Sequence, residues 1–423
     1  MAVTLPTRPT QPDDLVYDPY DYDIDRNPHP VWTRMRDEAP LYFNERHGFY
    51  ALSRYQDVLD GLTDWRTFSS GKGTVLELID ADDEGLAKGF SSDDLGQMIF
   101  TDPPGHDVAR KVVNRSFTPR AVSHLEHRIR DLCRLALDAV DPSGFDFLED
   151  FAGPIPAMVI GQMLGVPEED QRQLGRWVEM FLFYDPAVET GGEIQGVRQF
   201  NPVRMEGMTR MSAYIRDMVE DRRRSPRDDM ISHLLTTDVA LEDGSIRKLT
   251  TDEVLGFFVL LQSAGSETTA RLLGWAAILL ARHPDQREAL VERPDLIPNA
   301  VEELLRYEAP SPIQARYVTR DVELHGVRVP AGSKMALLNG SAGRDEREYP
   351  DPDRFDVERH MERHLTFGYS THFCLGAALA RLEGRVIIEE MLTRHPRWDC
   401  DEDRVEFVHT TTVRGPAKVP IRL

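Results

Sequence analysis

The sequence has only three cysteines, Cys133, Cys374 and Cys400, and they lie far apart in the chain. Such cysteines do not form the disulfide framework of a small secreted protein, which favours a reducing cytosol. The chain also lacks any run approaching about 18 uninterrupted apolar residues, and its first residues contain no apolar signal segment. We therefore expect a cytoplasmic protein without a membrane anchor.

Positive charge is scarce as well. Lys and Arg number 50 against 72 Asp and Glu, which gives a formal net charge of −22. Nucleic acid and anionic membranes repel such a chain, so neither is expected as a partner. The 423 residues, 41% of them hydrophobic, are sufficient for a large core or two ordinary domains.

Apolar periodicity predicts a mainly helical chain with a few short strands. Helical spacing covers residues 29–39, 55–62, 121–140, 155–164, 169–183, 205–224 and 298–307. Strand signals cover residues 40–43, 48–52, 314–319, 322–324, 327–329 and 334–338. Residues 1–25 are expected to be irregular. Residues 71–100 and 184–202 carry no clean period and are interpreted as functional loops; for residues 71–100 the alternative is a disordered acidic insertion.

The longest predicted helix covers residues 250–283, from a capping-box pattern at Thr250 and Glu253 to the residue before Pro284. Residues 264–269, AGSETT, interrupt its apolar middle with glycine, hydroxyls and a carboxylate. A mid-helix glycine costs about 1 kcal/mol relative to alanine, and a buried acid needs partners or water. From these residues alone the segment is either a kinked packing site or a functional site.

Residues 367–381, FGYSTHFCLGAALAR, read as a glycine-bearing loop followed by a helix. Cys374 then lies at or just before a helix N-terminus, where free N–H groups and the helix dipole favour a thiolate. Gly376 lets the backbone pass close to a flat partner, so we expect a cysteinate bound to haem iron. One alternative is a buried packing cysteine. The other is a zinc site formed by Cys374 with nearby histidines, namely His360, His364 and His372.

Two further pairs of side chains stand at helical spacing. His106 and Arg110 are separated by four residues after a helix start at Pro103 and Pro104, and Glu303 and Arg306 are separated by three. Taken alone, each pair is an ordinary contact on a helix face.

The 367–381 stretch resembles the haem-binding loop of the cytochrome P450 family, FGxGxHxCxGxxLAR, except that Ser370 replaces the second glycine. Five motifs occur in the family's order between residues 102 and 381: HxxxR, AGxET, ExxR, the PxG meander and FGxxxHxC. The resemblance implies a mainly α fold with small β-sheets, in which haem lies between the long central helix and the cysteine-ligand loop. It also implies a single domain over residues 1–423, with residues 71–100 and 184–202 as substrate-lid loops.

The resemblance assigns roles residue by residue. Cys374 is the metal ligand, Glu267 and Thr268 are the catalytic acid and alcohol, and Glu303 and Arg306 form a structural pair completed by Arg359 or Arg354. The expected cofactor-binding residues are His106, Arg110, Ala264, Gly265, Arg316, Phe367, His372, Cys374 and Gly376. The expected substrate-pocket residues are Leu260, Ser263, Pro312, Ile313 and Thr411.

The function that this resemblance implies is a haem-thiolate monooxygenase, which uses haem b and dioxygen to hydroxylate or epoxidise an apolar organic substrate. Electrons are expected from NAD(P)H through a ferredoxin reductase and a ferredoxin, and the protein is expected to be a monomer. Exposed basic residues, Lys111, Arg115, Arg120, Arg381 and Arg385, are expected to steer the ferredoxin. A peroxide-driven peroxygenase and a non-catalytic haem sensor are the alternatives; the intact Glu267–Thr268 pair argues against both.

Overall fold

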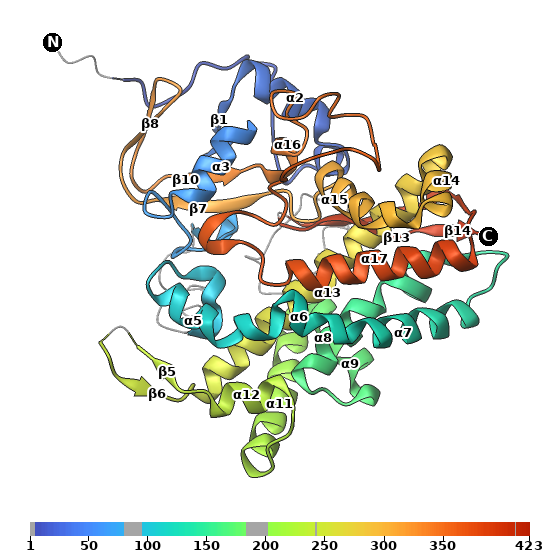
Figure 1. The fold of residues 1–423 in the computed structure, drawn as a ribbon. Coiled ribbons are helices and arrows are strands. Elements are labelled where there is room, and N and C mark those ends of the chain that lie inside the picture. Colours follow the sequence, from blue (N-terminus) through green and yellow to red (C-terminus); the bar gives the residue numbers. More distant parts are fainter. Residues whose placement is uncertain (1–4, 80–94, 183–201, 242, 411) are drawn as a thin grey trace.

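The computed structural model of the protein describes residues 5–79, 95–182, 202–241, 243–410 and 412–423 (Figure 1). The expected lid loop 184–202 lies outside the described residues except for Pro202, and so does the middle of the expected loop 71–100. The described ends of the latter are helical: residues 76–79 form α4 and residues 95–100 form a 3-10 helix.

Helices make up most of the described chain. They are α1 (Tyr22–Arg26), α2 (His29–Glu38), α3 (Tyr55–Thr63), α4 (Leu76–Ile79), α5 (Gly105–Val113), α6 (Pro119–Val122), α7 (Glu126–Ala139), α8 (Pro154–Leu164), α9 (Glu168–Leu182), α11 (Pro202–Arg224), α12 (Met230–Thr236), α13 (Thr251–Arg282), α14 (Pro284–Glu292), α15 (Ile297–Tyr307), α16 (Asn339–Ala342) and α17 (Ala377–Arg394).

The strands are short. They are β1 (Leu41–Asn44), β2 (Phe49–Leu52), β3 (Phe68–Ser69), β4 (Phe145–Asp146), β5 (Val239–Ala240), β6 (Ile246–Arg247), β7 (Gln314–Val318), β8 (Val322–Leu324), β9 (Val327–Val329), β10 (Lys334–Leu337), β11 (Asp399–Cys400), β12 (Glu406–His409), β13 (Arg414–Lys418) and β14 (Pro420–Arg422). The mainly helical fold with small sheets is therefore as predicted.

The prediction of one continuous helix over residues 121–140 is wrong. Residues 121–140 are divided between α6 and α7, with a 3-10 turn at Ser123–Leu125 between them. The Ser123 hydroxyl donates to the carbonyl of Arg120 at 2.9 Å, a side-chain bond that competes with regular helix geometry. Likewise, the irregular N-terminal segment ends earlier than expected, because Asp21 caps α1 by accepting from the N–H groups of Asp23 and Ile24.

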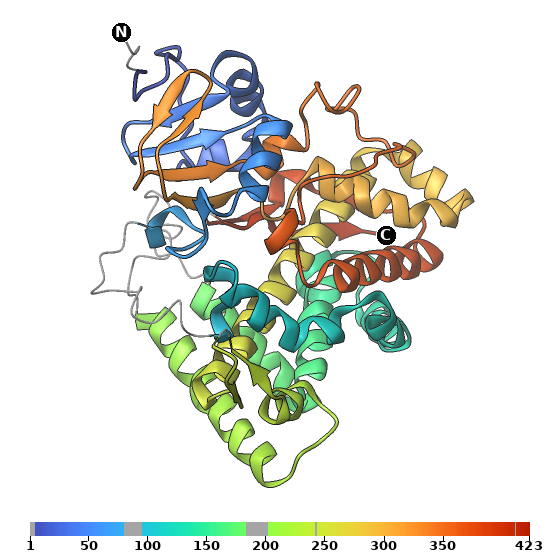
Figure 2. The same ribbon diagram turned by 60° about the vertical axis from the view of Figure 1, so that its left-hand side comes forward.

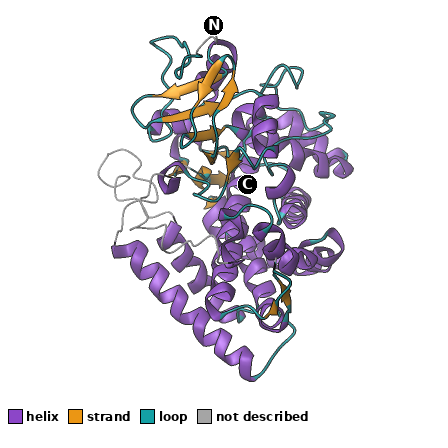
Figure 3. Ribbon diagram, turned by 90° about the vertical axis from the view of Figure 1, so that its left-hand side faces the viewer, coloured by secondary structure: helices purple, strands orange, loops and turns teal. Residues whose placement is uncertain are grey.

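The largest sheet has the order β1-β2-β10-β7-β3 and lies at one end of the molecule, where α3 and α4 contact it (Figures 2 and 3). β10 pairs in parallel with β2 and antiparallel with β7, with Leu337 opposite Gln314. Smaller sheets are formed by β11-β14-β4, β12-β13, β5-β6 and β8-β9. β7 matters most for the site, because its alternate residues Gln314 and Arg316 both line the central cavity.

The central helix α13 passes through the main apolar core. The predicted capping box is present: the Thr250 hydroxyl accepts from the Glu253 N–H at 3.2 Å, and the Glu253 carboxylate accepts from the Thr250 N–H at 2.8 Å. The helix packs against α8, α11, α17 and β13, and Phe257 and Phe258 are fully buried. α13 continues without a break through residues 264–269, so these polar residues stand at fixed positions within the core.

Candidate active site

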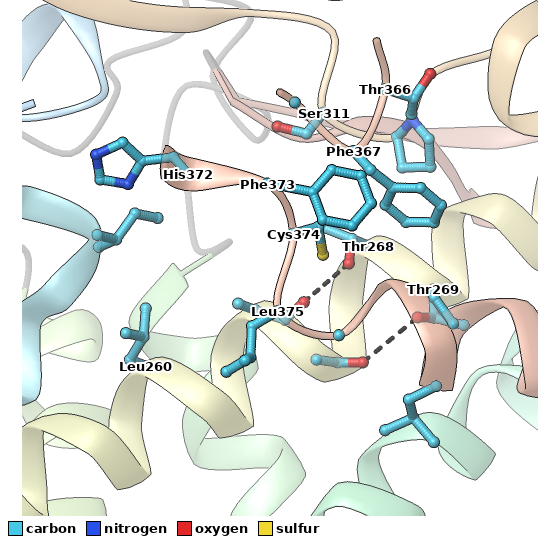
Figure 4. A pocket seen from close by; sticks show the side chains of 18 of the residues that line it. Leu260, Thr268, Thr269, Ser311, Thr366, Phe367, His372, Phe373, Cys374 and Leu375 are labelled. Carbon is cyan, nitrogen blue, oxygen red and sulfur yellow. Dashed lines mark hydrogen bonds between the residues drawn. The ribbon is translucent and has the colours of Figure 1, made fainter. Parts of the chain in front are cut away.

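A cavity of about 290 Å³ lies between α13, the Cys374 loop and β7. Figure 4 shows Cys374 on its loop and Thr268 on α13, both turned toward this cavity. The cavity brings together most of the site residues predicted from the sequence, namely His106, Arg110, Leu260, Ala264, Gly265, Thr268, Arg316, Phe367, His372, Cys374 and Gly376.

Four of the predicted pocket and catalytic residues do not line this cavity, and a fifth is not among the residues that the structure describes. Pro312 accepts a hydrogen bond from the Gly340 N–H at 3.0 Å, and Ile313 is buried in the apolar cluster around Trp32, on the opposite side of the strand from Gln314. Ser263 lies on α13 between cavity-lining residues but away from the cavity, and Glu267 lies on another face of α13. Thr411 is not among the described residues.

Cys374 is held by its own backbone: its N–H donates to the carbonyl of Phe367 at 2.8 Å, and α17 begins three residues later. A Cβ at Gly376 would meet nothing within 4 Å, so the backbone there borders open cavity. Burial raises the pKa of the Cys374 thiol, while the Gly376 N–H and the Arg110 guanidinium oppose this rise. The expected thiolate is therefore not produced by the helix N-terminus alone; a cationic metal would supply the remaining stabilisation.

Four basic side chains converge at one side of the cavity. The His106 and His372 rings lie with centroids 4.5 Å apart, and Arg110 donates to the carbonyl of Phe373 at 2.7 Å. Arg316 is buried and, within the described chain, forms no ion pair; its Nη1 donates only to the carbonyl of Ala315, at 2.8 Å. Burial lowers the pKa of Arg316 to about 10.

His372 completes this basic cluster. Its Nε2 atom is buried and makes no hydrogen bond to the described residues. Burial, and then the positive charge of Arg316, lower the pKa of His372 well below its usual range. His106 contacts Asp107 at 3.3 Å, but Arg110, Arg316 and His372 form no ion pair with the described residues. Buried cations and imidazoles without anionic partners are costly, so this cluster fits a bound group that carries carboxylates, as haem does.

On the opposite wall, hydroxyls of α13 hydrogen bond back to the helix. The Thr268 hydroxyl donates to the carbonyl of Ala264 at 2.8 Å and faces the cavity, and the Thr269 hydroxyl approaches the carbonyl of Gly265 at 3.5 Å (Figure 4). Glu267 is buried and pairs with Arg271 at 3.1 Å. The predicted acid and alcohol are thus adjacent in sequence but face different surroundings.

Comparison with known proteins agrees with this geometry. Residues 83–418 match the family described as Cytochrome P450. The chain belongs to this family. Cytochrome P450 130 of Mycobacterium tuberculosis is 36% identical over 404 residues, which cover 94% of this chain and 95% of that protein.

The descriptions of one further relative and of one solved structure name a small molecule. The vitamin D(3) 25-hydroxylase of Pseudonocardia autotrophica is 35% identical over 404 residues, covering 94% of each chain. The structure of a mutant of P450 EryK in complex with erythromycin B has a TM-score of 0.81 at 34% identity, covering 96% of this chain and 98% of that one. Members of the family bind haem b and use dioxygen, so this protein is a cytochrome P450 monooxygenase.

Behind the Cys374 loop of this P450 lies a buried ion-pair network. Arg306 contacts both carboxylate oxygens of Glu303, at 2.7 and 2.8 Å, and Arg359 contacts the same carboxylate at 3.2 Å. Arg359, rather than Arg354, is therefore the partner of this pair. Arg306 also donates to the carbonyls of Gly343 and Pro352, so the network joins α15 to the segment that precedes the ligand loop.

The zinc alternative does not fit the structure. His364 pairs with Glu302 at 3.1 Å, and the described residues contain no group of three or more metal-binding side chains that could hold an ion. Among the helices described here, none is long and apolar enough to cross a membrane.

Sequence reasoning missed several cavity residues, among which Glu383 is the most unusual. It lies on α17, and neither of its buried carboxyl oxygens makes a hydrogen bond of normal geometry within the described chain, although the Thr269 hydroxyl lies nearby. Burial raises the pKa of Glu383 well above its usual range, and the Thr269 hydroxyl opposes this rise. A carboxylate on the apolar face formed by Leu379, Val386 and Ile387 was the sequence signal that could have found it.

Proposed function

We propose that this P450 hydroxylates or epoxidises an apolar organic substrate in the cavity, with electrons from a ferredoxin and an NAD(P)H-dependent reductase. The observation that carries this proposal is one cavity in which the Cys374 sulfur, the Thr268 hydroxyl and the basic cluster meet walls that are mainly apolar, including Leu260. Vitamin D(3) and erythromycin B, named for two relatives, are both large organic compounds, which supports a substrate of that kind.

The residues present fit haem b. Cys374 would bind its iron, and His106, Arg110, Arg316 and His372 would hold its carboxylates. Ala264, Gly265, Phe367 and Gly376 line the cavity and would contact the haem. Bound haem supplies the activation of dioxygen, while these side chains fix its position and exclude water.

Cys374 is tested through the absorption spectrum. The reduced protein under carbon monoxide should show the red-shifted Soret band of a thiolate-ligated haem, because the thiolate donates electron density to iron. Cys374→Ser should lose this band, whereas Cys133→Ser and Cys400→Ser, matched controls elsewhere in the chain, should keep it. A Cys374→Ser protein with the native band would show that another residue binds the iron.

Thr268 is assigned to proton transfer, because its hydroxyl is a donor that faces the cavity. Glu267 is assigned as the acid that supplies it, which requires Glu267 to leave Arg271. Thr268→Ala should keep haem and substrate binding but divert reducing equivalents into peroxide. Ser266→Ala removes a hydroxyl bonded to the carbonyl of Gln262 in the same helix and should remain coupled. Equal peroxide yields in the two variants would remove Thr268 from catalysis.

A ferredoxin would bind near the exposed basic residues of α5, of the 3-10 helix Asn114–Phe117 that follows it, and of α6. Lys111, Arg115 and Arg120 are exposed and form no ion pair within the described residues, and the ring of Phe373 nearby is 39% exposed. Arg381 and Arg385, which were also expected in this patch, are instead paired, Arg381 with Glu302 and Arg385 with Glu126 and Glu389. The docking surface is therefore smaller than the sequence suggested.

The ferredoxin interaction is tested by charge reversal. Lys111→Glu with Arg115→Glu should slow reduction of the haem by ferredoxin, since a positive patch steers an acidic partner. The same charge change at Arg172 and Arg176, exposed on α9, is the matched control and should have a small effect. Wild-type reduction should also slow as salt rises. Equal slowing in both double variants would place the docking surface elsewhere.

A further inference from the structure

Three polar side chains stand together on the cavity wall, and neither the basic cluster nor the proton-transfer residues account for them. Ser311 lies in the connection between α15 and β7, Gln314 is the first residue of β7, and Asn339 is the first residue of α16. All three line the cavity, and Ser311 is visible on this wall in Figure 4. Most other residues that line the substrate side, such as Met98 and Leu260, are apolar.

These three residues are neighbours because of the strand register. Gln314 pairs with Leu337, two residues before Asn339, and the N–H of Gly340 donates to the carbonyl of Pro312 at 3.0 Å. The start of α16 therefore lies against the loop that carries Ser311. Within this group the Gln314 amide donates to the Ser311 hydroxyl at 2.9 Å.

Asn339 has unused hydrogen-bonding capacity. The residue is 1% exposed, and its Oδ1 makes no hydrogen bond within the described part of the chain. A buried polar atom left without a partner costs about 1–3 kcal/mol, so a ligand that pairs with it is favoured.

The unpaired atom also indicates the chemistry of its partner. Oδ1 is an acceptor, and the ionised carboxylates of haem offer acceptors alone, so they cannot satisfy it in this orientation of the amide. Arg316, two residues beyond Gln314 on the same face of β7, is the group suited to those carboxylates. The partner of Asn339 must be a donor, and a neutral hydroxyl is the donor that an otherwise apolar substrate can carry.

We propose that Ser311, Gln314 and Asn339 form a hydroxyl-recognition site, so that the substrate is an apolar molecule bearing an alcohol group. The proposal rests on the proposed function and narrows its substrate class. The hydroxyl anchored at this wall fixes which carbon of the substrate faces Thr268. Specificity of this kind is strong, because a substrate without the hydroxyl leaves the Asn339 amide oxygen unpaired.

The test uses three ligands of one rigid skeleton: 2-adamantanol, 2-adamantanone and adamantane. Their binding to the full-length holoprotein is measured by the spin-state shift of the haem spectrum and by equilibrium dialysis. The wild type should bind the alcohol about tenfold more tightly than the hydrocarbon. The ketone, which can accept from Ser311 and the amides but cannot donate to Asn339 Oδ1, should bind between the two. Asn339→Leu should abolish this preference mainly by weakening alcohol binding.

Further variants distinguish a substrate hydroxyl from water or the cofactor as the partner of these side chains. Gln314→Leu is the second variant, because it removes a neighbouring amide outside α16, and it should also reduce the preference. Met98→Leu changes an apolar lining residue and should preserve it. An unchanged preference in both amide variants, or loss of haem from them, would overturn the proposal, since water or the cofactor would then be their partner. Absence of a thiolate-type spectrum in the wild type would instead contradict the proposed function.

Discussion

The Glu303 network and the cavity wall both contain buried polar side chains, but they differ in how these are paired. Glu303 and Arg306 are each 0% exposed, and their charges are matched by one another, by Arg359 and by backbone carbonyls. On the cavity wall, His372 Nε2 and Asn339 Oδ1 have no such partner among the described residues. A saturated network stabilises the fold, whereas unsaturated polar atoms indicate where a ligand is held.

The largest expected effect comes from breaking the saturated network. Glu303→Gln removes the negative charge between Arg306 and Arg359 and leaves two guanidiniums without a carboxylate in the interior. Removing one partner of a buried pair costs about 3–5 kcal/mol, so little folded holoprotein should be recovered. The measurement is urea denaturation together with haem content.

Its matched control removes an exposed carboxylate. Glu402 pairs with Arg282 at 2.6 Å, and both side chains are exposed. Glu402→Gln should therefore lower the free energy of unfolding by less than about 1 kcal/mol. A similar loss in both variants would show that burial does not distinguish the two pairs.

This contrast explains which features the sequence could predict. The bounds of α13 followed from local signals, a capping box and Pro284, and the six strands that the sequence predicted lie within a residue of their predicted positions. The break between α6 and α7 escaped prediction because the apolar period continues through it, while a side-chain bond from Ser123 and a new helix start decide the backbone.

The site divides in the same way. Cys374, Thr268 and Arg316 were assigned from the resemblance to the motifs of the family, and the structure places them around one cavity. Pro312 and Ile313 were chosen in place of Ser311 and Gln314 because the face that a loop or strand turns to a cavity depends on its register with β10, which no local pattern contains. Asn339 was missed for the same reason, since its lack of a partner becomes visible only in three dimensions. Glu383 differs, because a carboxylate on the apolar face of α17 was a signal already present in the sequence.

An effect of intermediate size on stability is expected at Glu383, a titratable residue of the cavity wall whose carboxyl oxygens make no hydrogen bond of normal geometry to the described residues. Because its pKa is raised in the folded protein, the folded state binds more protons than the unfolded state once the pH exceeds the ordinary value for glutamate. Stability should therefore fall as the pH rises above about 4.5, by up to about 1.4 kcal/mol per pH unit, until the folded pKa is reached.

Glu383→Gln removes this titration. Denaturation between pH 5 and pH 8 should show the variant gaining stability over the wild type as the pH rises, with little difference at pH 5. Glu402→Gln, at an exposed carboxylate, serves as the control with no such trend. A constant difference across this range would mean that Glu383 is ionised in the folded protein and has a partner.

The smallest effect is expected at Ser370, which belongs to neither region. It replaces the second glycine of the ligand-loop pattern, and its φ is 58°, in the left-handed region, with an exposed side chain. A non-glycine residue there is strained by about 1–2 kcal/mol, but glycine also makes the unfolded chain more flexible, at a cost of about 0.4–1 kcal/mol. Ser370→Gly should therefore raise the free energy of unfolding by about 1 kcal/mol or less and leave the carbon monoxide spectrum unchanged.

Ser370→Val is the control. Its branched side chain tolerates this φ poorly, so this variant should have a lower free energy of unfolding than the wild type. If the two variants were equally stable, strain at this turn would be negligible; a spectral change in Ser370→Gly would instead show that Ser370 acts on Cys374 and belongs with the cavity residues.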